Sequence, residues 1–260
     1  MKVTYLPVLA VLRELYLQPR TMRRFRAYVE TLTGAGSGDV VLPIGVANPM
    51  AKEHALTRID QLLAQGSETI GAAAARFAEA RLAPVPVSIE IKASIVLADD
   101  VGGGWTNRYT TEAMVRFPSR GALKRPFATA LVWTSEATPA TDQLNAEVLA
   151  AIYRVAFQQR FGLPVSLKQR LEQEGLAASF AGQVPALTAA QLEGVREIIG
   201  QLGDEPPYPT LFAALYGDEA AEQLGYQRLG LPPRAGFELA LSDTLARGDD
   251  PTSALLTTRA

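Results

Sequence analysis

The segment VSIEIKASIVLA, residues 87–98, shows the most regular pattern in the chain. Apolar side chains occupy every odd position from Val87 to Leu97, and mostly polar or small side chains occupy the even positions. Successive side chains of a strand point to opposite faces of a sheet. The alternation therefore predicts a twelve-residue β-strand with one buried face.

A second alternating segment, residues 105–117, follows after the six residues of Asp99–Gly104. Together the two segments predict a long antiparallel β-hairpin, 87–98 paired with 105–117. Residues 126–134 are apolar at both alternations, as in a central strand that is covered on two sides. We therefore expect an antiparallel sheet of three to five strands.

Helical spacing of apolar residues characterises both ends of the chain. The N-terminal predictions are two helices within 5–33 separated at Pro19, a short strand over 40–46, a helix from Pro49 to Ala64 with Asn48 as its N-cap, and helices over 67–82 and 141–161. The C-terminal predictions are a helix capped by Ser166, a capping box of Thr188 and Gln191, and two short helices within 208–230. Strands in the middle and helices at both ends indicate an α+β fold, with the sheet packed against helices from both halves of the chain.

The helix-ending glycines suggest how the chain is organised into domains. We expect an α+β core domain over residues 1–162, a helical annex packed on it over 163–248, and a weakly ordered tail over 249–260. A chain of 260 residues is close to the upper size of a single hydrophobic core.

Composition excludes several classes of function. The chain has no cysteine, which rules out disulfides, Cys-ligated zinc and Cys-held iron–sulfur clusters. The 25 basic and 27 acidic residues give a net charge of −2, so nucleic acid is disfavoured as a partner. No apolar run approaches the length of a membrane span. We expect a soluble, cytoplasmic protein without a membrane partner; a homo-oligomer remains open.

Two glycine-rich segments do not fit a nucleotide loop. Gly34–Gly38 and Gly102–Gly104 both precede a predicted strand, whereas a phosphate loop opens a helix and carries a Lys before Ser or Thr. His54 is the only histidine, and no Gly-x-Ser-x-Gly elbow accompanies it. Nucleophilic-serine hydrolysis therefore has little support.

The predicted hairpin tip is the first candidate site. It concentrates carboxylates, an indole, an amide and a guanidinium, contributed by Asp99, Asp100, Trp105, Asn107, Arg108 and Glu112. Adjacent carboxylates can serve as catalytic groups or as ligands of magnesium or calcium, and Arg108 can bind a carboxylate or phosphate. The mixture suits a small polar or anionic molecule. The alternative is a solvated turn whose glycines and aspartates only supply unusual dihedral angles.

A second polar cluster lies at the start of the helix predicted after Asn48. It contains Asn48, Lys52, Glu53 and His54, and His54 is the candidate acid–base residue. If both clusters lie on one rim, we expect acid–base or metal-assisted chemistry; ordinary helix capping is the competing explanation.

Two further functions stay open at the level of sequence. Small amphipathic helices and the lack of a complete catalytic motif also fit a non-catalytic interaction or oligomerisation module. A basic turn with interleaved aromatic residues could bind single-stranded nucleic acid, and its basic residues are Arg116, Arg120, Lys124 and Arg125.

Overall fold

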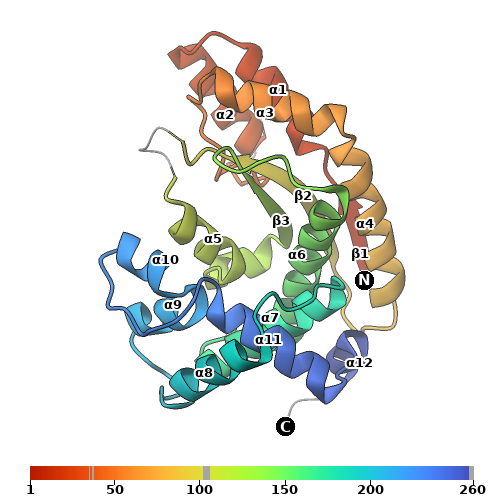
Figure 1. Ribbon diagram of the computed structural model, residues 1–260. Coiled ribbons are helices and arrows are strands. Elements are labelled where there is room, and N and C mark those ends of the chain that lie inside the picture. The colour runs from red at the N-terminus through yellow and green to blue at the C-terminus, as the bar shows by residue number, and fades with distance from the viewer. Residues whose placement is uncertain (35, 37, 102–105, 258–260) are drawn as a thin grey trace. The chain divides into compact units, whose positions relative to one another are not determined.

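The computed structural model describes residues 1–34, 36, 38–101 and 106–257 (Figure 1). The chain divides into two compact units, Met1–Val155 and Ala156–Ala260. The division falls inside a single long helix, α6 (Thr141–Phe161), whose bounds agree with the sequence prediction.

The sheet of the first unit is parallel. Its strands are β1 (Lys2–Tyr5), β2 (Glu90–Ala98) and β3 (Phe127–Trp133), in the order β1-β2-β3. Val3 lies opposite Ile91, and Ser94 lies opposite Thr129. The predicted antiparallel hairpin and antiparallel sheet are therefore wrong, although β2 and β3 themselves lie within the predicted strands.

The error concerns the predicted strand 105–117, because its described part, residues 106–117, contains a helix, α5 (Arg108–Arg116), in place of a returning strand. Asn107 caps this helix by accepting a hydrogen bond from the Thr110 amide at 3.0 Å. Glu112 and Arg116 form an ion pair at the (i, i+4) spacing, with 2.7 Å between the nearest atoms. β-Branched and aromatic residues favoured the strand prediction, but a helix in the connection lets β3 run parallel to β2.

Strand β2 is covered on both faces. Every residue from Ala93 to Ala98 is buried, including Ser94 and Val96, which the alternation placed on a polar face. Helix α4 (Ser67–Leu82) packs against β1 and β2, and α1 (Val8–Leu17) packs against β2. Continuous burial of this kind is typical of a parallel strand.

A close approach fixes β1 against α4. A Cβ atom at Gly71 would lie 2.3 Å from Cε2 of Tyr5, so only glycine lets the ring reach the helix backbone. The hydroxyl of Tyr5 donates to Glu68 of the same helix, and burial raises the pKa of Tyr5. The strand prediction missed β1 because its four residues are too few to show a pattern.

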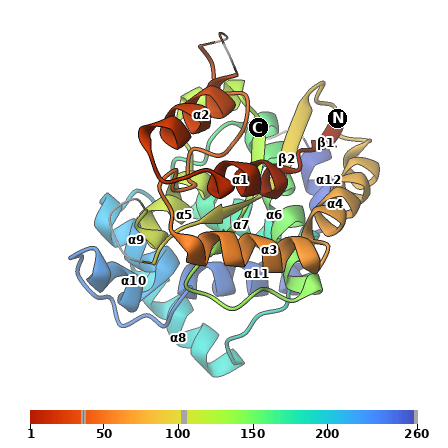
Figure 2. The ribbon, with the colours of Figure 1, turned by 90° about the horizontal axis from the view of Figure 1, so that it is seen from above.

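The helices α2 (Met22–Thr33) and α3 (Glu53–Ala64) complete the N-terminal part, where α1 and α3 lie side by side (Figure 2). Helix α3 begins at Glu53, four residues later than predicted, and residues 40–46 form no strand. The basic turn contains a short 3-10 helix, η1 (Arg120–Lys124).

The second unit is helical. After the end of α6 it contains α7 (Leu167–Phe180), α8 (Ala189–Gly200), α9 (Tyr208–Tyr216), α10 (Asp218–Gln223), α11 (Ala235–Arg247) and α12 (Pro251–Leu256). Both predicted caps are present, as capping boxes at Ser166 and Thr188. Helix α12 lies where the sequence suggested a weakly ordered tail, and its Leu255 is fully buried. Within the described part of the chain, no helix combines the length and apolarity that crossing a bilayer requires.

Candidate functional site

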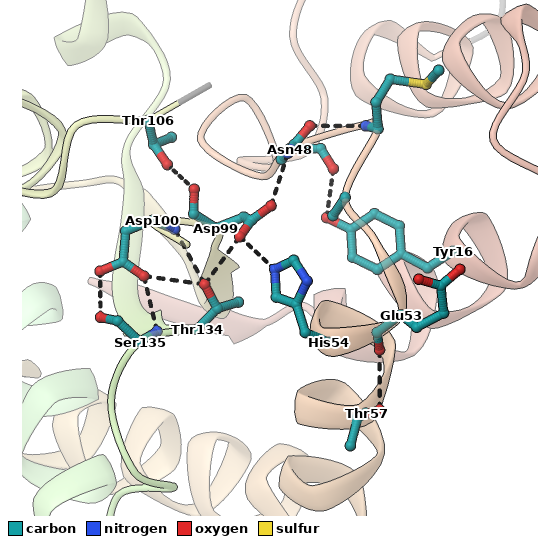
Figure 3. Close-up of polar contacts among 12 residues, drawn as sticks. Tyr16, Asn48, Glu53, His54, Thr57, Asp99, Asp100, Thr106, Thr134 and Ser135 are labelled. Carbon is teal, nitrogen blue, oxygen red and sulfur yellow. Dashed lines mark hydrogen bonds and ion pairs between the residues drawn. The ribbon is translucent and has the colours of Figure 1, made fainter. Parts of the chain in front are cut away.

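Polar residues gather where β2 and β3 end. Asp99 and Asp100 follow β2 directly, and Thr134 and Ser135 follow β3. Because the strands are parallel, both pairs lie at the carboxyl edge of the sheet, the edge at which open α/β sheets bind their ligands (Figure 3).

Asp99 is the centre of this group. Its side chain is only 4% exposed, and it accepts hydrogen bonds from three segments of the chain. His54 Nε2 lies 2.7 Å from Oδ1, the Thr134 hydroxyl lies 3.0 Å from Oδ1, and the Asn48 amide nitrogen lies 2.8 Å from Oδ2. Both carboxylate oxygens are therefore bound by protein groups.

These contacts explain the electrostatics of Asp99. Burial by itself raises the pKa of a carboxyl, but the hydrogen bonds from His54, Asn48 and Thr134 outweigh it and hold the pKa of Asp99 below its ordinary value. Asp99 is thus ionised at neutral pH. A buried carboxylate of this kind requires hydrogen-bonding partners to be stable.

His54 is oriented by this carboxylate. It is the second residue of α3, and its side chain is one-third exposed. An ionised carboxylate only accepts hydrogen bonds, so Nε2 of the neutral imidazole carries the proton and Nδ1 presents a lone pair. Among the described residues, the structure gives Nδ1 no hydrogen-bond partner. A partly exposed imidazole with one nitrogen fixed by a buried aspartate can move a proton to or from a ligand.

Two further hydrogen bonds fix the side chain and the carbonyl of Asn48. Its Oδ1 accepts from the Met50 amide at 2.9 Å, so its side-chain nitrogen must face Asp99. The Tyr16 hydroxyl donates to the Asn48 carbonyl at 2.9 Å. Burial raises the pKa of Tyr16, and the charge of Asp99 adds to this effect.

Asp100 ties the two strand ends together. Its Oδ1 accepts from the Ser135 amide at 2.9 Å, and its Oδ2 accepts from the Ser135 hydroxyl at 2.6 Å. The Thr134 hydroxyl lies 3.1 Å from the same Oδ1, so one hydroxyl proton serves the two neighbouring aspartates. Asp100 therefore holds the start of the loop after β3 by hydrogen bonds, whereas Asp99 binds His54.

The other residues predicted for the site fall into separate roles. Burial lowers the pKa of Arg108, but the ion pair with Glu136 outweighs burial and raises it. The guanidinium of Arg108 lies over the Trp133 ring, 5.4 Å from its centroid. Asn107 caps α5, and the Glu112 side chain is buried against Arg116. Lys52 is exposed at the start of α3. Trp105 lies outside the described residues.

The structure thus brings together Asn48, His54, Asp99 and Asp100 from the two predicted clusters. Sequence reasoning missed Tyr16, Thr134 and Ser135. Thr134 and Ser135 could have been found, because they directly follow an apolar strand and would lie beside Asp99 if that strand paired directly with β2.

A metal site at Asp99 and Asp100 stays a prediction. Over the described ranges, no three His, Cys, Asp or Glu side chains are grouped so that they could hold a metal ion. The four carboxylate oxygens of the two aspartates accept from protein donors instead.

Comparison of the chain with protein-family models, with curated proteins and with solved structures gives no match.

Proposed function

We propose that the protein is an enzyme in which His54 exchanges a proton with a small polar ligand at the carboxyl edge of the sheet. Asp99 holds the imidazole in the tautomer that leaves Nδ1 able to accept a proton. The observation that carries this proposal is the 2.7 Å contact between His54 Nε2 and the buried Asp99 carboxylate.

The direction of the contact supports a catalytic role. A histidine that only stabilises the fold needs no particular nitrogen free, whereas a general base must present one to solvent while the other is anchored. Imidazole also changes charge near neutral pH more readily than any other side chain.

The rigidity of the pair supports the proposal as well. Asp99 is held by three donors, and the Asn48 donor is itself held by the Met50 amide. Catalytic groups work best when the residues around them fix their orientation in advance.

The test is a pair of variants, His54→Gln and Asp99→Asn, assayed against small polar substrates for ester and phosphoester hydrolysis, proton abstraction beside a carbonyl, and dehydration. We expect wild-type turnover in one of these classes and a fall in kcat of about 10²- to 10⁴-fold in both variants. Asp142→Asn, an exposed aspartate in the first turn of α6, is the matched control and keeps wild-type activity.

Turnover that survives both substitutions would contradict the proposal. So would a wild-type protein that turns over none of these substrates and whose His54 nuclear magnetic resonance signals respond to none of them. The second result would favour a non-catalytic interaction module.

A further inference from the structure

The backbone carbonyls of residues 48–51, the turn that carries Asn48, bind side chains from a distant part of the sequence. Each of these four successive carbonyls accepts a hydrogen bond from a side chain of the segment 16–24. The contacts are Tyr16 to Asn48 at 2.9 Å, Arg24 Nε to Pro49 at 2.8 Å, Arg20 to Met50 at 3.0 Å, and Arg24 Nη2 to Ala51 at 2.5 Å. The conformation of residues 48–51 is therefore set by side chains of α1, of α2 and of the turn between them.

Arg24 makes the largest contribution. It is 2% exposed, and its Nη1 also donates to the carbonyls of Tyr16 and Gln18 at 3.3 and 3.4 Å. Its guanidinium lies over the Tyr16 ring, 5.3 Å from the centroid. Burial lowers the arginine pKa. Among the described residues, its hydrogen-bond partners are all carbonyl oxygens, and the charge of Glu53 offsets only part of the effect of burial.

Burying the charge of Arg24 costs free energy of desolvation, and the contacts that it makes depend on the shape of the guanidinium group. A planar guanidinium presents several donors in a fixed fork and can reach two carbonyls of one turn at once, whereas an ammonium acts as a single point. Nε of Arg24 donates to the Pro49 carbonyl and Nη2 donates to the Ala51 carbonyl, so both carbonyls face the guanidinium. The Met50 amide then donates to Asn48 Oδ1, and the side-chain nitrogen of Asn48 is left to face Asp99.

We infer that Arg24 is a positioning residue of the site: it holds the 48–51 turn so that Asn48 binds Asp99 Oδ2 and leaves Oδ1 facing His54. The link to catalysis rests on the proposed function, but the link to the orientation of His54 does not. Arg24 acts through Asn48 and touches neither His54 nor the ligand edge.

The experiment measures the imidazole ¹⁵N shifts of His54, which report its tautomer, in wild type, Arg24→Gln, Asn48→Ala and the double variant. His54 is the only histidine, so the signals need no assignment. Arg24→Gln is expected to reduce the Nε2–H population and to lower kcat by about 10²-fold with little change in KM. Asn48→Ala should do the same, and the double variant should be no worse than either single one.

Three controls separate positioning from simple loss of structure. Arg23→Gln makes the same substitution at an exposed neighbour and should leave the spectrum unchanged. Arg24→Lys keeps the charge without the fork and should not restore the wild-type spectrum. If Arg24→Gln does not fold, Tyr16→Phe and Arg20→Gln each release one carbonyl of the turn and should shift the tautomer in the same direction.

The inference is overturned if Arg24→Gln folds with the wild-type His54 spectrum, if its effect adds to that of Asn48→Ala, or if neither release variant shifts the tautomer. These outcomes differ from a failure of the proposed function. If His54→Gln retains activity while Arg24→Gln disturbs the tautomer, the enzyme proposal falls and the positioning role stands.

Discussion

Asp99 is the residue on which the site depends, because its buried charge is stabilised by donors from three separate segments of the chain. Sequence reasoning selected both Asp99 and His54, one as half of an adjacent aspartate pair and the other as the sole histidine. It could not show that they meet, since 45 positions separate them and only the tertiary fold closes that distance.

The lowered pKa of Asp99 predicts a pH-dependent stability. Ionised Asp99 stabilises the fold fully above the ordinary carboxyl pKa of about 3.9, and this contribution is lost as the pH falls through the lower pKa of the folded state. Urea unfolding at pH 7 should show Asp99→Asn to be about 1–3 kcal/mol less stable than wild type, since Asn48 then faces an amide. The difference should shrink below about pH 4. A difference that is constant from pH 7 to pH 3 would contradict this assignment, as would an equal loss in Asp142→Asn.

Among the elements, α5 shows where pattern reasoning failed and why. Tyr109, Thr111 and Val115 alternate as in a strand, and residues of these types favour strands. The cap at Asn107 and the pair of Glu112 with Arg116 were helical signals in the same stretch. The local preference for a strand was overridden by the topology, because two adjacent parallel strands need a crossover connection and α5 supplies it.

Longer helices were predicted more accurately. The bounds of α4 and α6 agree with the sequence prediction, Thr188 forms the expected capping box, and Ser166, which was expected only as a cap, forms a capping box as well. These elements carry their own start and stop signals, so they depend less on tertiary context. The start of α3 was misplaced because the side chains that bind the 48–51 carbonyls lie about 30 positions away.

The packing of α7 against α11 gives a prediction at this scale. A Cβ atom at Gly175 of α7 would lie 2.3 Å from the Ala240 carbonyl oxygen of α11, so Gly175→Ala should destabilise the protein by about 1–3 kcal/mol. Gly194→Ala is the matched control in α8, where nothing lies within 4 Å, and it should stabilise by about 0.5–1 kcal/mol. Urea unfolding measures both changes. Equal effects of the two substitutions would contradict the close approach of these helices.

For the molecule as a whole, the order of the strands in the sheet decides which side chains can share a site. The sequence predicted β2, β3 and most helices, but whether β3 pairs directly with β2 depends on the path of the connection, which no single-strand pattern records. An antiparallel meander would insert the returning strand 105–117 between the two, so residues 134 and 135 would lie one strand away from Asp99. Direct pairing of β2 with β3 places them beside Asp99, where the Thr134 hydroxyl reaches both aspartates.

The position of the site at this edge makes His54 a reporter of the whole arrangement, because its tautomer is fixed only if α3, β2 and the Asn48 turn are assembled as described. The most direct measurement is the ¹⁵N spectrum of the neutral His54 imidazole in wild type and in Asp99→Asn. We predict that wild type carries its proton on Nε2 and that Asp99→Asn loses this preference. A wild-type imidazole protonated on Nδ1, or a spectrum that Asp99→Asn leaves unchanged, would contradict the account.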